Sequence, residues 1–146
     1  MNTKNGIAVP TLQWVLSLHV LIDPTDDLGV CTEGQRSNYR ITGGHFEGLN
    51  VRGEVIAGGA DFYLLRSDQG EWINIHNTGV ITLSDRGRAQ VAQGLWPIAE
   101  EDYHCSCTPR FQVASGRLDW LTRSVMIGKV GYPAADQVAI HCYRLT

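Results

Sequence analysis

Asp61 stands where a proton-transfer group is easiest to justify, directly after a Gly-Gly-Ala bend and before two aromatic residues. If the expected strand over residues 60–66 alternates, Asp61, Tyr63 and Leu65 share one face. A carboxylate on such an apolar wall can act as a general acid or base. The alternative is that Asp61 only accepts backbone N–H groups from the bend, as Asp beside a turn commonly does.

His76 and His104 could supply the acid partner of Asp61, because imidazole transfers protons well near neutral pH. His76 lies in Asn-Ile-His-Asn-Thr, where alternate polar residues line one strand face. That face borders a cavity, or it is only solvated. Alternation turns Cys105 and Cys107 away from His104, and no two histidines have ligand spacing, so we predict no metal site. The five histidines, each on a different expected strand, are His19, His45, His76, His104 and His141.

A second group of residues could hold a substrate beside these catalytic candidates. Tyr39 or Arg40 could stabilise a carbonyl or enolate oxygen. The aromatic residues could line a pocket for a ring-bearing hydrophobic ligand, with a few polar groups to orient it, or they could form an ordinary core. The predicted substrate-binding residues are Tyr39, Arg40, His45, Tyr63, Asn77 and Trp120.

Several classes of protein lack support in the sequence. There is no Gly-x-Ser-x-Gly nucleophile elbow, and neither glycine pair is followed by the helix and lysine that cradle phosphate. A net charge of −3, from 12 Lys and Arg against 15 Asp and Glu, argues against nucleic acid and anionic membranes as partners. The start lacks signal-peptide features, and the apolar stretch over residues 12–22 is too short to span a bilayer. We expect a cytoplasmic protein without a cofactor.

The elements that position these residues are expected to be strands of one domain, residues 1–146. Of the 146 residues 16 are glycine, a share that favours strands, tight turns and bulges over helices. The pair Gly43-Gly44 predicts a bulge or sharp bend within a strand. Expected strands cover residues 11–22, 39–47, 51–57, 60–66, 72–83, 88–94, 103–108, 111–113, 121–128 and 137–145, with hairpin turns at 68–70 and 85–87 and a loop over 23–37.

Short connections favour an antiparallel meander, and closure would remove the exposed edges of so many strands. The predicted fold is therefore all-β, a single closed antiparallel β-barrel of about eight to ten strands, mostly in meander order.

Two stretches resemble a known family. Residues 42–48 read Thr-Gly-Gly-His-Phe-Glu-Gly, and residues 52–62 read Arg-Gly-Glu-Val-Ile-Ala-Gly-Gly-Ala-Asp-Phe. They are similar to the G-G-x-F-x-G and G-x-V-x-x-G-G-A-D-W motifs of the domain-of-unknown-function family 3237, also called uncharacterised protein family 0311. The resemblance runs from Leu12 to Leu145. It implies a small closed β-barrel, similar in shape to allene oxide cyclase and dirigent barrels, with no settled activity.

The sequence departs from the family pattern at three polar positions. It has Asn77-Thr78-Gly79 where many members have Asp-x-Arg, Ser106 where they have Arg, and Thr122 where they have Asn. The first two changes remove charged side chains, so we expect a less polar substrate than other members take.

The functional hypothesis is a cofactor-independent enzyme of the isomerase, cyclase, lyase or hydratase type, including pericyclic steps, that acts on a hydrophobic metabolite in the barrel cavity. Asp61 would be the base or hydrogen-bond acceptor, with His76 or His104 as the acid. The alternative is a non-catalytic carrier or sensor, and a third reading is an oligomeric scaffold with a solid core. The expected partner is a small hydrophobic substrate, with neither nucleic acid nor membrane, and the sequence allows a homodimer.

Overall fold

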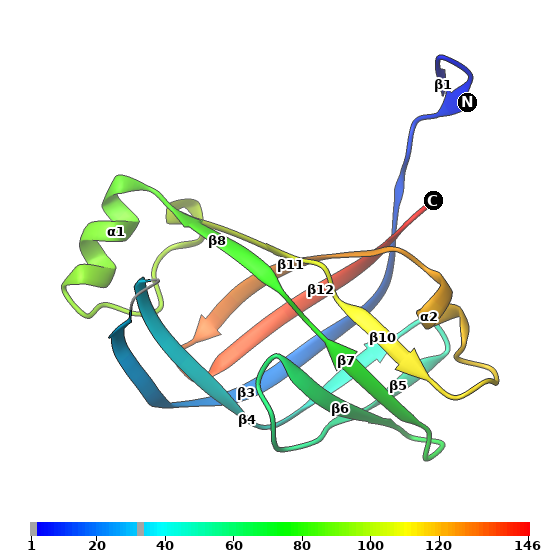
Figure 1. Cartoon of the computed structure of the whole chain (residues 1–146), viewed down its shortest axis with the longest axis horizontal. Coiled ribbons are helices and arrows are strands. Elements are labelled where there is room, and N and C mark those ends of the chain that lie inside the picture. Colours follow the sequence, from blue (N-terminus) through cyan, green and yellow to red (C-terminus); the bar gives the residue numbers. More distant parts are fainter. Residues whose placement is uncertain (1–2, 32–33) are drawn as a thin grey trace.

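The fold is an antiparallel β structure whose described part also contains two short α-helices and one 3-10 helix (Figure 1). The computed structural model describes the backbone of residues 3–31 and 34–146, and the side chains in these ranges outside residues 24–38. The strands are β1 (Thr3–Lys4), β2 (Ile7–Ala8), β3 (Leu12–Cys31), β4 (Gly34–Gly48), β5 (Val51–Val55), β6 (Phe62–Ser67), β7 (Trp72–His76), β8 (Gly79–Leu83), β9 (Tyr103–Cys107), β10 (Arg110–Val113), β11 (Met126–Ala134) and β12 (Gln137–Leu145). The helices are α1 (Asp85–Ala92), the 3-10 helix η1 (Glu100–Asp102) and α2 (Trp120–Arg123).

Strands β3 to β12 form a ten-stranded sheet in the order β10-β7-β6-β5-β4-β3-β12-β11-β9-β8, and β1 pairs with β2 in a separate hairpin. Every ladder between described strands is antiparallel. The all-β prediction is therefore confirmed. The prediction of a single closed barrel is not, because this strand order ends at β10 and β8.

The bulge predicted at Gly43-Gly44 is confirmed. Leu21 pairs with Gly43 whereas Ile22 pairs with Ile41, so β4 contains one extra residue at this point. Gly44 has a φ of 132°, and a Cβ there would lie 2.0 Å from the carbonyl oxygen of His19. Glycine is required because the two backbones approach too closely for any side chain.

The predicted loop over residues 23–37 is wrong. Strand β3 continues to Cys31 and β4 begins at Gly34, so the two strands form a long hairpin. Register shifts between Asp23 and Asp26 and between Asp27 and Gly29 interrupt the ladder. These bulges accommodate Pro24 and Gly29, residue types that are also typical of loops.

The predicted strand over residues 88–94 is wrong as well, because residues 88–92 belong to helix α1 and a turn follows. The Ser84 hydroxyl accepts the N–H of Gly87 at 2.9 Å and donates to Asp102 Oδ1 at 2.9 Å. A serine cap of this kind satisfies the free amides of the first turn. The predicted strand over residues 121–128 is shortened in the same way, since α2 occupies its start and β11 begins at Met126.

The apolar core lies on one face of the curved sheet. Alternate residues of β6 show the period of two clearly, with Tyr63 and Leu65 buried and Phe62 and Leu64 exposed. The fully buried large side chains are Phe46, Leu16, Leu18, Leu65, Ile73, Ile75, Leu121, Val15 and Cys142. Helix α1 lies at one end of the molecule, and α2 lies at the opposite end with the chain termini (Figure 1). We call these the α1 end and the α2 end.

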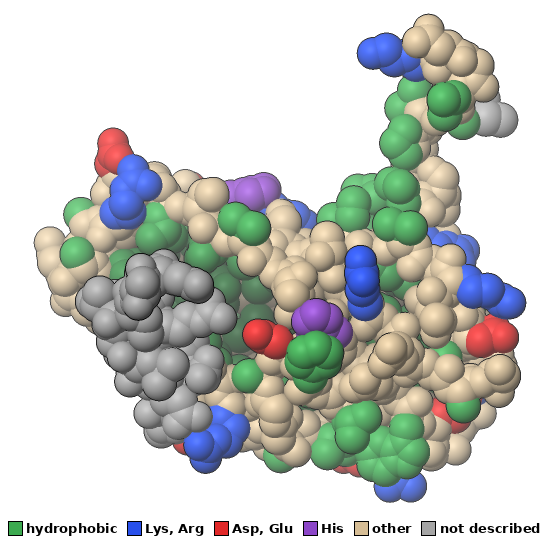
Figure 2. Space-filling model, in the orientation of Figure 1, with side chains coloured by type: hydrophobic (Ala, Val, Ile, Leu, Met, Phe, Trp, Pro, Cys, Tyr) green, Lys and Arg blue, Asp and Glu red, His purple; other side chains and the backbone are tan. Residues whose placement is uncertain are grey.

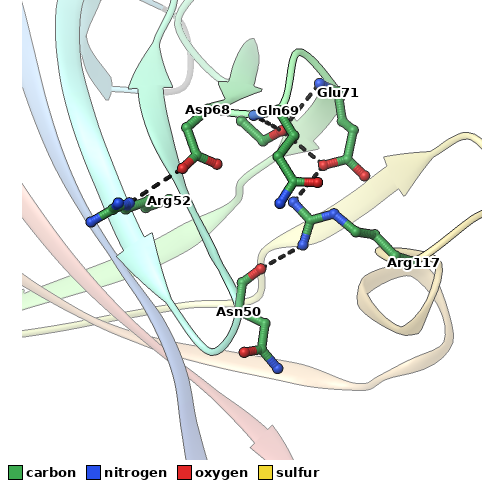
Figure 3. A network of polar contacts seen from close by, with 7 residues as sticks. Asn50, Arg52, Asp68, Gln69, Glu71 and Arg117 are labelled. Atoms are coloured by element: carbon green, nitrogen blue, oxygen red, sulfur yellow. Dashed lines mark hydrogen bonds and ion pairs between the residues drawn. The ribbon is translucent and has the colours of Figure 1, made fainter.

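A polar network fastens the α2 end (Figure 3). Arg117 donates to the carbonyl oxygen of Asn50 and to Glu71 Oε1, both at 2.6 Å, and Ser67 donates to the same Glu71 oxygen at 2.8 Å. The arginine thereby ties the segment before α2 to two hairpin turns. The next residue, Leu118, is buried in the core. Among the described residues no helix is long and apolar enough to cross a membrane.

Candidate functional site

A group of uncharged polar side chains faces the core from β6, β9, β12 and the residue that follows β7. Tyr63 is 6% exposed, and its hydroxyl has no hydrogen-bond partner among the described residues. The same holds for Oδ1 of Asn77, the residue that follows β7. Since nearly all buried polar groups in proteins are paired, two unpartnered oxygens of this kind call for an explanation. We call Tyr63, Asn77, Cys107 and Cys142 the inner polar group.

The side chains of the inner polar group lie close enough to influence one another. Burial raises the pKa of Cys107 to about 11, although a hydrogen bond from the Asn77 side chain acts in the opposite direction. Burial also raises the pKa of Cys142 and of Tyr63, and Cys107 adds to both shifts. At neutral pH the group therefore consists of a phenol, an amide and two thiols, all uncharged.

Gly128 of β11 makes room for the two thiols. It is the register partner of Cys107 on β9 and of Cys142 on β12, so the cysteines flank it on adjacent strands. A Cβ at Gly128 would lie 2.4 Å from Cys107 Sγ and 3.2 Å from a methyl group of Ile140. The Cys107 sulfur thus occupies the space above the glycine.

Aromatic side chains gather at the α1 end, beyond the inner polar group. The ring of Tyr132 meets Trp96 edge to face at 4.8 Å and Tyr103 at 5.5 Å. The Tyr132 hydroxyl lies 3.5 Å from Cys105 Sγ, and the Tyr103 hydroxyl accepts the N–H of Tyr132 at 3.2 Å. We call Trp96, Tyr103 and Tyr132 the aromatic cluster. Figure 2 shows a hollow lined by hydrophobic side chains at this end of the molecule, beside the atoms drawn in grey.

Asp61 lies at the edge of this region. It precedes β6, and its carbonyl oxygen accepts the N–H of Asn77 at 2.9 Å, so the β6–β7 ladder extends one step to bring the two residues together. Its side chain is exposed. The ladder runs from here to Ser67 at the α2 end, which places Asp61 toward the α1 end. The structure therefore brings together three sequence-predicted site residues: Asp61, Tyr63 and Asn77.

The predicted histidines lie elsewhere. The ring of His76 stacks on exposed Phe62 at 3.8 Å, on the opposite face of β6 from Tyr63. His104 is exposed and lies 3.1 Å from both Ser106 Oγ and Lys129 Nζ. His45 stacks on His19 at 4.6 Å. These imidazoles are on the outer face of the sheet, away from the inner polar group.

The remaining predicted residues divide between the two ends. Tyr39 and Arg40 are exposed on β4. Burial raises the pKa of Tyr132, and Tyr39 lies near enough to add to this shift. Trp120 belongs to α2, where the guanidinium of Arg144 lies 5.7 Å from its ring centre. Trp120 is thus at the end opposite Asp61.

A shallow groove of about 320 Å³ runs along the outside of the β5–β6 bend. Because exposed Phe62 and Leu64 form much of its wall, it faces solvent rather than the core. The lining residues are Ile56, Ala57, Gly58, Gly59, Phe62, Tyr63, Leu64 and Asn74.

Sequence reasoning missed Cys105, Cys107, Cys142 and the aromatic cluster as site residues. The predicted alternation could have found two of them, since Cys105 and Cys107 are indeed buried whereas Ser106 and His104 share the outer face. No local signal indicated Cys142, which reaches the site only through pairing of β12 with β11. Within the described residues no three His, Cys, Asp or Glu side chains come together as metal ligands.

The fold and site define a class: a small antiparallel β protein with a neutral inner polar group. The chain belongs to the family described as protein of unknown function DUF3237, whose model matches residues 10–145. It is 24% identical to a UPF0311 protein of Rhodopseudomonas palustris strain TIE-1, over 93% of this chain and 98% of that protein.

Solved structures share the fold. A β-barrel-like protein from Acinetobacter baumannii superposes with a TM-score of 0.82 at 26% identity, covering 98% of this chain and all 100% of that one. An enzyme from Penicillium herquei superposes with a TM-score of 0.65 at 17% identity, with both chains covered to 100%. The second likeness concerns the fold alone.

Proposed function

We propose that this protein is a cofactor-independent enzyme that binds a small, uncharged hydrophobic molecule between the inner polar group and the aromatic cluster. The observation that carries the proposal is the pair of buried oxygens without partners, on Tyr63 and Asn77. The Tyr63 hydroxyl can donate to a ligand carbonyl, and Asn77 Oδ1 can accept from a ligand hydroxyl. A bound molecule with both groups would satisfy the two positions at once.

The electrostatics of the site support a neutral ligand. The inner polar group is uncharged at neutral pH because burial holds the thiols and the phenol in their protonated forms. A carboxylate or phosphate placed among these side chains would lose its hydration without gaining a cation in return. The aromatic cluster would contact the apolar body of the ligand, as pocket walls commonly do.

Catalysis in such a site would rest on positioning and one carboxylate. Asp61, which is exposed beside Asn77, would act as the general base that takes a proton from the ligand, or would accept a hydrogen bond from it. The Tyr63 hydroxyl would stabilise negative charge that develops on a ligand oxygen. Tyr63 would act by hydrogen bonding rather than by proton release, since its pKa lies above the usual range. Isomerisation, cyclisation, elimination and hydration fit this set of groups.

The proposal also requires an enclosed interior, and we infer that the sheet closes on itself. Two residues separate β7 from β8, and two separate β9 from β10, so each pair can be read as one bent strand. These strands pair on both sides of the bends, through His76 with Arg110 and Gly79 with Cys107. The N–H of Thr108 donates to the carbonyl oxygen of Thr78 at 2.8 Å in between. This continuity supports a closed barrel.

A non-catalytic carrier is the second candidate function. It is favoured by the outward positions of His76 and His104, which leave the inner polar group without an imidazole. Three buried free thiols, on Cys105, Cys107 and Cys142, support a reducing, cytoplasmic location for either function.

The two functions can be separated by incubating the protein with a cell metabolite extract and following each compound by mass spectrometry. The enzyme proposal predicts that the wild type consumes a neutral compound, that Asp61→Asn abolishes turnover and that this variant still binds. Asp68→Asn is the matched control, because Asp68 lies in the β6–β7 turn and pairs with Arg52. A compound that is retained unchanged by wild type and variants would establish the carrier and refute the enzyme.

A further inference from the structure

Residues 3–10 form an arm that stands away from the body (Figure 1). All side chains from Thr3 to Trp14 are exposed, including Ile7 at 75% and Val9 at 47%. Strands β1 and β2 pair only with each other among the described strands. We call residues 3–10 the N-terminal arm. A two-stranded hairpin without a packing partner is marginal in water.

The arm leaves the body beside a second exposed apolar surface. Leu12 is 54% exposed and pairs with Leu145 of β12, which is 42% exposed. The N–H of Leu145 donates at 2.9 Å to the carbonyl oxygen of Val125, itself 65% exposed. Trp14 follows on the same strand at 39% exposure. We call Leu12, Trp14, Val125 and Leu145 the foot patch.

The arm and the patch have the same character. Lys4 is the only charged residue between positions 3 and 14, and the foot patch carries no charge. Figure 2 shows hydrophobic side chains along the arm and at its foot, with the arm extended away from the body. The arm therefore leaves the foot patch of its own chain uncovered. Two adjacent apolar surfaces low in charge are typical of the centre of an interface.

We propose that a second copy of this chain covers the foot patch, with each arm lying on the patch of the other copy. A single two-fold axis near Thr11 would bring each arm onto the foot patch of the other copy, because the arm and the patch are adjacent in every chain. The body anchors the arm at this point, since Thr11 and Thr146 exchange two backbone hydrogen bonds of 2.8 and 2.9 Å. A different partner protein would have to match both surfaces independently, whereas a second copy brings the complement of each. The arms then gain the packing that an isolated hairpin lacks.

The test is the mass of the full chain in solution, measured by light scattering during gel filtration at micromolar concentrations. The wild type is expected at twice 16.1 kDa. Ile7→Asp and Val125→Asp should each weaken the dimer at least about tenfold, because a charge at either surface is buried without a partner. Val80→Asp is the matched control, since Val80 is 69% exposed on β8 of the body and should leave the mass unchanged.

Circular dichroism of each variant shows that the fold is retained, which it should be at exposed positions. A monomeric wild type at these concentrations would overturn the proposal. So would a dimer that survives both Ile7→Asp and Val125→Asp, because the contact would then lie elsewhere.

Discussion

Replacing Tyr63 by Phe should stabilise the free protein. The substitution removes a buried hydroxyl that has no hydrogen-bond partner and keeps the ring in the core. A buried polar group without a partner costs about 1–3 kcal/mol, and Phe leaves a small gap where the oxygen was. We expect the free energy of unfolding to rise by about 1 kcal/mol, and the midpoint of thermal unfolding to rise by about 2–4 °C.

Tyr103→Phe is the matched control, because the hydroxyl that it removes is in use. The Tyr103 oxygen accepts the N–H of Tyr132 at 3.2 Å. Its loss should lower the free energy of unfolding by about 1 kcal/mol, since a half-buried amide is left without its acceptor. Urea unfolding at neutral pH measures both variants. The reasoning is refuted if Tyr63→Phe destabilises the protein by more than about 0.5 kcal/mol, which would mean that the hydroxyl has a partner in the free state.

Tyr63→Phe, which should stabilise the free protein, should weaken ligand binding. A suitable probe is a neutral hydroxy-acetylnaphthalene, compared with the hydroxynaphthoate that carries a carboxylate in place of the acetyl group. The wild type should bind the ketone and not the carboxylate. Tyr63→Phe should weaken binding of the ketone about tenfold, the value of one hydrogen bond. A gain in stability together with a loss of binding is the signature of a polar group reserved for a ligand.

Three further predictions concern the stability of the folded protein. Gly128→Ala should lower the free energy of unfolding by about 1–3 kcal/mol, because its Cβ would lie 2.4 Å from Cys107 Sγ. Adding Cys107→Ala should restore most of this loss in urea unfolding. A double variant that is no more stable than Gly128→Ala would contradict this placement of the thiol. Burial raises the pKa of Cys107 from 9.0 to about 11, so the contribution of its thiol to stability should be complete below pH 9 and decline toward pH 11. The free energy of unfolding of Cys107→Ala should therefore fall less steeply over this pH range than that of the wild type. Identical pH profiles of the two proteins would disprove this prediction. Arg117→Met should lower the free energy of unfolding by about 1 kcal/mol, because the variant loses the hydrogen bonds to Asn50 and Glu71. Arg52→Met, which breaks an exposed ion pair, should change it little. Equal effects would show that the Arg117 network is not specific.

Much of the sheet could be predicted because its signals are local. Alternation of apolar residues indicated β3, β6 and the shared face of Tyr63 and Leu65, and the glycine pair at 43–44 located the bulge. The failures arose where a side chain outside the pattern decides the structure. Ser84 converts an apparent hairpin turn into the first turn of α1, because its hydroxyl also binds Asp102 eighteen positions along the chain.

The candidate site was harder to predict because it depends on pairing between distant strands. Asp61 and Asn77 were both chosen from the sequence, but only the β6–β7 ladder shows that they are neighbours. For His76 the sequence left both a cavity and a solvated strand face open, and its position opposite Phe62 puts it on the outer face. Cys142 reaches Cys107 across Gly128, over a separation of 35 positions between the two cysteines that no spacing rule anticipates. Register, rather than composition, determines which polar residues converge.

The central claim is that the core-facing side chains near Tyr63 bind a neutral molecule. Methyl NMR of protein labelled at isoleucine tests it most directly, because Ile75 and Ile140 are buried in the core whereas Ile7 is exposed on the arm. Titration with the hydroxy-acetylnaphthalene should shift the Ile75 and Ile140 methyl signals in a saturable way, leave Ile7 unchanged, and lose affinity in Tyr63→Phe. Unchanged core methyl signals at saturating probe, or shifts confined to exposed methyl groups, would contradict the account.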